Sequence, residues 1–385
     1  MTNISEKNII NWRHHLHQNP ELSFNEVQTS QFIYDTLKTF PNLTTIVRPT
    51  ATSVIATLDT GKPGKTIGLR ADIDALPILE ETDIPFKSVN DGVMHACGHD
   101  CHTAILLGTA ETLAAIKDEL TGKVVFIFQH AEEVPPGGAR EIVATGILDD
   151  LDLVFGLHVI NEKTGTIGYR YGMPNANSDR FTLKIQGRGG HAANPDKAID
   201  PVLISTELVN SLYHIVARNV DPFDQAVLTV GEISSGDVAN IIPDTATVKA
   251  TIRTTSKTTR KLMEAKIRAT IDAIVTMHGA TYEIDFTHGY SAVTNDDAAV
   301  DMMLKVANEV VGAENIYVSP QGMGGEDFSA YTDKFPGCFY YIGVGGKADG
   351  YNYGVHHPLF KVDEAGLITG AKMHVELIKS ILGSK

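Results

Sequence analysis

Residues 95–102, HACGHDCH, form the segment of the sequence that is densest in reactive side chains. It contains three histidines, two cysteines and one aspartate, and an apolar stretch that is predicted to be helical follows it. Cys97 and His99 are two residues apart, so on an extended segment both side chains point to one side. A thiolate and an imidazole suit zinc, manganese, cobalt or nickel. This density favours metal binding over a loop with chance histidines and one buried thiol, but it does not separate a catalytic from a structural site.

Other candidate groups occur where apolar runs end. Glu132 and Glu133 follow the run at 124–129. Adjacent carboxylates can divide labour, because one binds a metal while the other moves protons. The remaining candidates are His158 in GLH, His356 or His357 in GVHHPLF, and Asp72 and Asp74 in RADIDALP. Each alone is more typical of a core histidine or a solvated polar position, but thiolate, imidazole and carboxylate groups scattered over several strand ends indicate a catalytic site.

An α/β fold is expected to position these side chains. Short apolar runs rich in β-branched residues predict strands, and longer periodic stretches predict the helices between them. The strands are expected at 53–58, 66–73, 124–129 and 152–159, and the helices at 5–18, 26–38, 101–117 and 137–146. Strands that alternate with helices predict a catalytic domain with a central mixed or parallel sheet flanked by helices.

A second pattern begins near Asn175. A strand, a helix, two antiparallel strands, a helix and a closing strand are expected in that order, with the helices at 198–216 and 257–278 and the later strands at 226–233, 247–255 and 281–286. This order is that of a ferredoxin-like α+β unit. It predicts an inserted domain over residues 178–288, between catalytic segments 1–177 and 289–385. A helix at 296–312 and a strand at 338–344 complete the first domain.

Bulk properties narrow the classes of protein that fit. The length of 385 residues exceeds what one hydrophobic core usually supports, so two domains are expected. The net charge of −15 argues against nucleic-acid and anionic membrane partners. The sequence has no secretory leader pattern, no apolar run long enough for a spanning helix, and only three cysteines. We therefore expect a protein of the cytoplasm, a reducing compartment.

The motifs occur in the order known from one family. They are RHHLHQNPELSFNE, LRADIDALPI, MHACGHDCH, AEE, GLH, GGHAA, NIIPD…TIR, GGEDFS and HHPLF. The sequence resembles the amidohydrolase branch of the carboxypeptidase G and aminoacylase type of metallopeptidases. That branch includes hippurate hydrolases, indoleacetyl-amino-acid hydrolases and deacetylases of N-acetyl amino acids. The resemblance implies that the inserted domain is a lid or dimerisation domain, through which a homodimer or homotetramer forms.

The resemblance also implies two divalent metal ions per subunit, either manganese, zinc, cobalt or nickel. It assigns Cys97 as the ligand that bridges the two ions. The other implied ligands are His99, Glu133, His158 and His356, the last in preference to His357. Glu132 is the implied general base, and Asp74 orients the site from behind the ligands.

Further implied roles lie on the inserted domain. His191 would reach a neighbouring subunit and polarise the scissile carbonyl, while Asn240 and Arg253 would hold the main chain and carboxylate of the substrate. The sequence departs from the family at His130, where proline is common, and at Asp196, where histidine is common. Neither is an implied ligand, so these departures concern the substrate rather than the chemistry.

These roles predict metal-dependent hydrolysis of the amide bond of N-acyl amino acids, with N-acetyl or aroyl groups as the expected acyl groups. Two ions about 3.5–4 Å apart would share a water and lower its pKa. Glu132 would take the proton of that water and return it to the leaving amine. One alternative is a dipeptidase or aminopeptidase on the same scaffold, for which the sequence does not locate an acidic partner of a free α-amino group. Another is a non-catalytic metal-dependent binding protein, which has no need of Glu132.

Overall fold

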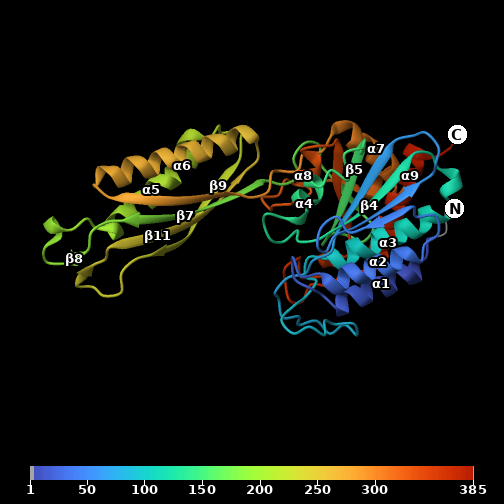
Figure 1. Cartoon of the computed structure of the whole chain (residues 1–385), viewed down its shortest axis with the longest axis horizontal. Coiled ribbons are helices and arrows are strands. Elements are labelled where there is room, and N and C mark those ends of the chain that lie inside the picture. The colour runs from blue at the N-terminus through green and yellow to red at the C-terminus, as the bar shows by residue number, and fades with distance from the viewer. Residues whose placement is uncertain (1–3, 385) are drawn as a thin grey trace. The chain divides into compact units, whose positions relative to one another are not determined.

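The computed structural model describes residues 4–384, and the chain forms two compact units (Figure 1). The first unit comprises the chain up to Pro174, residues 293–321 and the chain from Asp327 onward. The second comprises 175–292 and 322–326. The expected inserted domain, 178–288, lies within this second unit. The short segment 322–326 joins the unit because the Ala176 N–H donates to the Gly324 carbonyl at 3.1 Å.

The first unit is built on an eight-stranded mixed sheet, as expected, with the order β1-β2-β4-β3-β5-β14-β6-β13. Its strands are β1 (Thr45–Val47), β2 (Val54–Asp59), β3 (Thr66–Asp72), β4 (Lys123–Gln129), β5 (Leu153–Ile160), β6 (Ile167–Tyr169), β13 (Ile316–Val318) and β14 (Gly337–Gly343). The four central strands, β4, β3, β5 and β14, are parallel to their neighbours within that group. Parallel strands end at one edge of a sheet, so the residues that follow β3 and β4 and those near the end of β5 lie close together.

Helices cover both faces of this sheet (Figure 1). They are α1 (Glu6–Gln18), α2 (Val27–Lys38), α3 (His99–Ala115), α4 (Gly138–Ala144), α7 (Asp297–Val311), α8 (Ser329–Thr332) and α9 (Ala365–Leu382). Helices α2, α3, α7 and α9 pack on one face, α4 and α8 pack on the other, and α1 packs on α3. Among residues 4–384, no helix has both the length and the apolarity needed to cross a bilayer.

Strand β4 explains why the sequence shows a continuous apolar run there. Val124, Phe126 and Phe128 belong to the larger core on one face of the sheet. Val125 and Ile127 belong to the smaller core on the other face. A central strand of a sheet that is covered on both sides buries successive side chains in both directions, so the usual polar alternation is lost.

The start of α3 differs from the expected extended segment around Cys97. The helix begins at His99, and Gly98 adopts a left-handed conformation with a φ of 88°. The expectation that Cys97 and His99 share one side of an extended strand is therefore wrong, and a tight turn brings them together instead. Glycine is required at this turn, because a Cβ at Gly98 would lie 2.4 Å from Val159 Cγ2.

The second unit has the expected β-α-β-β-α-β order. Its elements are β7 (Asn177–Gln186), α5 (Pro201–Asn219), β9 (Ala226–Ser234), β11 (Thr245–Thr254), α6 (Lys257–Met277) and β12 (Thr281–His288). The four strands form an antiparallel sheet in the order β12-β7-β11-β9. Helices α5 and α6 pack on the apolar face of this sheet and form one hydrophobic core with it. A two-residue ladder of β8 (Gly190–His191) and β10 (Ile241–Ile242) extends from it.

The turn at Gly98 generates a stability prediction. Gly98→Ala should lower the melting temperature more than Gly92→Ala does, because both residues have a positive φ but an added Cβ at Gly92 meets no atom within 4 Å. The left-handed strain alone costs about 1–2 kcal/mol for alanine. Thermal unfolding of both variants measures the difference, and equal shifts would contradict the claim that the contact with Val159 requires glycine.

Candidate metal centre

Four potential ligands gather around the Cys97 thiol. Cys97 Sγ lies 3.4 Å from His158 Nε2 and 3.3 Å from His356 Nε2. Two groups of potential ligands include this sulfur, and within each group the ligand atoms lie within 4.8 Å of one another. The groups are Cys97, His99 and His158, and Cys97, Glu133 and His356. The Cys97 sulfur is the atom that these two groups share.

His99 supports a cation at this place. Its Nε2 is buried and makes no hydrogen bond among the described residues, and Asp72 Oδ2 lies 3.6 Å away. Burial opposes the charged imidazole, but Asp72 and Asp74 outweigh it and raise the pKa of His99 to about 10. An imidazole that binds a proton this tightly reflects an excess of buried negative charge, which a divalent cation would neutralise. The residues present therefore fit a metal ion.

Asp74 fixes the orientation of two of these groups. Its Oδ1 lies 3.1 Å from His99 Nδ1, and its Oδ2 accepts hydrogen bonds from the Glu133 backbone N–H at 3.0 Å and from Ser23 Oγ at 2.7 Å. Burial opposes the charge of Asp74, but these bonds lower the pKa of its carboxyl. With Nδ1 facing Asp74, the second nitrogen of His99 faces the centre, as a metal-binding histidine requires.

His158 presents a lone pair to Cys97. Its Nδ1 lies 2.6 Å from the Val159 carbonyl oxygen, which can only accept, so Nδ1 carries the proton and Nε2 faces the sulfur. Burial and the neighbouring His102 lower the pKa of His158 to about 3. The side chain is therefore a neutral imidazole, which is the form that binds metals.

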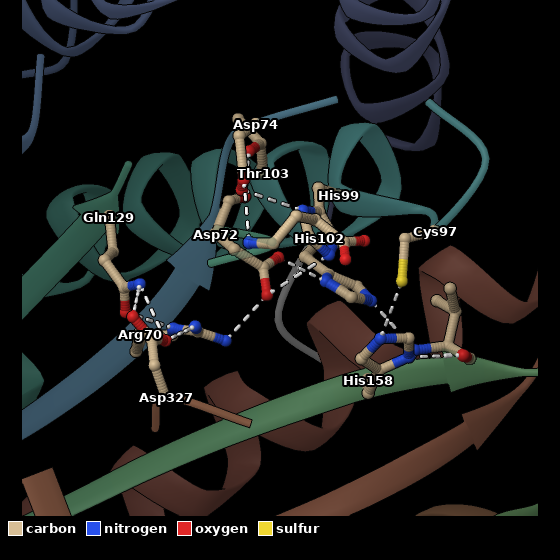
Figure 2. A network of polar contacts seen from close by, with 12 residues as sticks. Arg70, Asp72, Asp74, Cys97, His99, His102, Thr103, Gln129, His158 and Asp327 are labelled. Carbon is tan, nitrogen blue, oxygen red and sulfur yellow. Dashed lines mark hydrogen bonds and ion pairs between the residues drawn. The ribbon is translucent and has the colours of Figure 1, made fainter. Parts of the chain in front are cut away.

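His102 lies in the 95–102 segment with Cys97 and His99, but it has no free lone pair for a metal. The Val159 backbone N–H donates to His102 Nε2 at 2.9 Å, so the proton is on Nδ1, 2.5 Å from Asp72 Oδ1 (Figure 2). Both nitrogens are engaged. His102 thus links α3 to β3 and β5 and supports the centre from behind.

A buried cation beneath the centre was not identified from the sequence. The Arg70 guanidinium donates to Asp72 at 2.7 Å, to Asp327 at 2.8 Å and to Gln129 at 2.8 Å (Figure 2). Burial opposes the charge of Asp72, but Arg70 and the nearby histidines hold the pKa of its carboxyl well below its usual range. Arg70 and Asp327 lie within LRADIDALPI and GGEDFS, but 257 positions separate them, so only the fold reveals their contact.

The structure distinguishes His356 from its neighbour. His356 has a positive φ of 67°, its N–H donates to the Ala96 carbonyl at 2.7 Å, and its Nε2 lies 3.2 Å from Glu133 Oε1. His357 Nδ1 instead accepts the Leu359 N–H at 3.1 Å. Only His356 of the pair therefore faces Cys97.

Glu132 lies beside the centre without belonging to either group that contains Cys97. It is 7% exposed, and one carboxylate oxygen lies within 4.8 Å of potential ligand atoms of His99 and Glu133.

The surroundings of Cys97 oppose its ionisation. Burial, Glu133 and Glu132 raise the pKa of Cys97 well above its usual value. A thiol in this setting becomes a thiolate only with a cation at hand, which favours a ligand over a free nucleophile.

The predicted residues of the second unit do not all lie together. His191 is on β8, opposite Ile241 of β10, and the Ala192 N–H donates to the Asn240 carbonyl at 3.1 Å. His191 and Asn240 are thus neighbours, and both are exposed. Arg253 lies eight residues along β11 from Thr245, which is about 26 Å at the usual rise of a strand.

His130 packs in the interior of the first unit. It is 1% exposed, its Nε2 lies 3.0 Å from Glu141 Oε2, and its ring meets that of Phe24 edge-on. The departure from the family at this position is therefore a change in packing beside the Glu132 loop.

A sheet edge that gathers a thiol, imidazoles and carboxylates in this way defines the class of metal-dependent hydrolases. Residues 68–380 match the model of peptidase family M20/M25/M40, so the chain belongs to that family. The resemblance that the sequence motifs indicate is confirmed.

Similar proteins include amidohydrolases and a metal-binding peptidase. The chain is 40% identical to the putative amidohydrolase YhaA of Bacillus subtilis, over 94% of this chain and 91% of the relative. It is 45% identical to an N-acyl-L-amino acid amidohydrolase of Geobacillus stearothermophilus, over 75% of this chain and 78% of the relative. The crystal structure of the Bacillus subtilis protein YXEP, described as a dinuclear metal-binding peptidase of the M20 family, has a TM-score of 0.84 and 34% identity, covering 97% of each chain.

Proposed function

We propose that the protein hydrolyses the amide bond of N-acyl amino acids and releases a carboxylate and a free amino acid. The observation that carries this proposal is the position of Cys97 in both groups of potential ligands, with the Glu132 carboxylate beside them. The similar N-acyl-L-amino acid amidohydrolase supports the substrate class. N-acetyl and aroyl groups are the proposed acyl groups.

Two divalent ions are the proposed cofactors. Cys97 would bridge them, with His99 and His158 on one side and Glu133 and His356 on the other. Mixed sulfur, nitrogen and oxygen ligands suit manganese, zinc, cobalt or nickel. When bound, such ions polarise a carbonyl and lower the pKa of a water to near neutrality.

Glu132 is the proposed general base. Its buried carboxylate lies close enough to the ligand atoms of His99 and Glu133 to accept a proton from an attacking water there. The same carboxyl would then deliver the proton to the leaving nitrogen. Asp74 would keep His99 and the Glu133 backbone in place during both transfers.

The second unit is proposed to join two copies of the chain. Strand β9 is an edge strand of its sheet, and the apolar side chains of Val227 and Ile233 on it are exposed. Unpaired edges of this kind pair readily with another strand, and symmetric pairing gives a dimer. We propose that His191 of the partner subunit then polarises the scissile carbonyl, while Asn240 and Arg253 contact the substrate.

We also propose that the protein is located in the cytoplasm. Its three cysteines are free and buried, which is typical of proteins in a reducing compartment.

Glu132→Gln should lower kcat for N-acetyl amino acids by about 10²–10⁴-fold, because general acid–base transfer typically contributes that much. Its metal content should stay at the wild-type level, since Glu132 is outside both groups that contain Cys97. Steady-state kinetics and elemental analysis measure the two quantities. Retained activity would refute the role of Glu132. Wild-type activity on dipeptides but not on N-acetyl amino acids would favour a dipeptidase.

Two cysteine variants serve as controls for metal content. Cys97→Ala should lose metal, whereas Cys101→Ala should retain it. Cys101 is also buried, within α3, but belongs to no group of potential ligands among residues 4–384. Full occupancy in Cys97→Ala would remove Cys97 from the proposed ligands.

Mixing two inactive variants tests the action of His191 across subunits. His191→Ala and Glu132→Gln subunits, dissociated and reassociated together, should regain activity, because one hybrid site combines an intact His191 with an intact Glu132. Up to about a quarter of wild-type activity is expected from random mixing of dimers. Each variant reassociated alone is the control, and no gain on mixing contradicts action across subunits.

A further inference from the structure

Glu26 is a buried carboxylate that none of the proposed roles uses. It is fully buried and belongs to no group of potential metal ligands among the described residues. It precedes helix α2, but its side chain makes no capping hydrogen bond to that helix. Its hydrogen bonds go elsewhere, so a structural role in starting α2 does not account for it.

The Glu26 carboxylate holds the loop that precedes the proposed base. Its Oε1 accepts the Ala131 N–H at 2.8 Å and the Phe24 N–H at 2.9 Å, and its Oε2 accepts from Thr52 Oγ1 at 2.9 Å. Ala131 and Phe24 both have a positive φ, 51° and 65°. Residues other than glycine disfavour a positive φ. The Oε1 atom of Glu26 therefore stabilises two strained residues, Phe24 and Ala131.

Glu132 is fixed from both sides by groups that come from other parts of the chain. The residue before it is held by Glu26, 105 positions away, and the N–H of the residue after it is held by Asp74, 59 positions away. The second anchor holds the backbone of the proposed ligand Glu133, whereas the first contacts none of the proposed ligands. The two anchors can therefore be separated by mutation.

We propose that Glu26 is a positioning residue for Glu132, which keeps Ala131 in the left-handed conformation that directs the Glu132 carboxylate at the metal centre. The proposal deepens the proposed function, because it rests on Glu132 as the base. Its consequence is specific. Loss of Glu26 should reduce proton transfer while metal binding, which depends on the Asp74 anchor, persists.

The test compares three variants in the full-length protein with N-acetyl amino acids. Glu26→Ala should lower kcat by about 10²-fold, as expected for a displaced catalytic group, with KM and metal content within about twofold of wild type. Glu26→Gln retains a carbonyl oxygen that accepts both N–H groups, so it should recover most of kcat. Thr52→Val, the matched control, removes only the bond to Oε2 and should be close to wild type.

Hydrogen exchange of the Ala131 amide gives a readout that does not depend on activity. The amide should exchange slowly in the wild type and in Glu26→Gln, and fast in Glu26→Ala. Fast exchange in the wild type overturns the proposal even where Glu26→Ala fails to fold. An unchanged kcat in Glu26→Ala, loss of metal together with activity, or a Gln variant as impaired as the Ala variant also overturns it. If the wild type cleaves no N-acyl amino acid, the proposed function fails while the exchange still tests the positioning.

Discussion

The ion pair between Arg70 and Asp72 is the interaction on which the rest of the site depends. Asp72 ends β3, binds His102 of α3 and accepts the Thr103 hydroxyl at its carbonyl, so it joins the strand to the helix that carries His99. His102 in turn accepts the Val159 N–H of β5. A carboxylate in this interior would be very unfavourable without a partner, and Arg70 supplies it. Removal of one member of such a buried pair typically costs about 3–5 kcal/mol.

The second constraint is charge. Arg70 carries one positive charge and contacts both Asp72 and Asp327. Burial and the nearby carboxylates raise the pKa of the Cys97 thiol, and Asp72 and Asp74 raise the pKa of His99 to about 10. The shift of His99 indicates that negative charge gathers around its imidazole. A bound divalent ion would therefore stabilise this region, because it would offset the charge of the buried carboxylates that surround it.

Much of this arrangement could be predicted from the sequence, because short-range patterns determine it. Buried strands read as apolar runs, and the alternation with helices predicted a sheet whose strand ends gather Asp74, Glu133 and His158. Contacts between distant positions could not be predicted in the same way. Arg70 and Asp327 meet only in the fold, and Glu26 acts on a loop more than a hundred residues away.

Local geometry around the site also could not be predicted from the sequence. The left-handed turn at Gly98 requires glycine because Val159 of β5 leaves no room for a side chain there. Likewise, His99, His102 and His158 are of one residue type, so the sequence alone does not distinguish their roles. The partners of their second nitrogens, which belong to β5 and to the end of β3 with the segment that follows it, decide which of them has a lone pair for a metal. Such choices depend on tertiary contacts, and a pattern of spacing does not contain them.

Anomalous diffraction from crystals of the manganese- or zinc-loaded protein tests the central claim most directly, since the claim is that Cys97 bridges two cations. The account predicts two anomalous peaks per subunit, about 3.5–4 Å apart, with the Cys97 sulfur between them. His99 and His158 should lie next to one peak, and Glu133 and His356 next to the other. A single peak, or two peaks of which only one lies next to Cys97, would contradict the account.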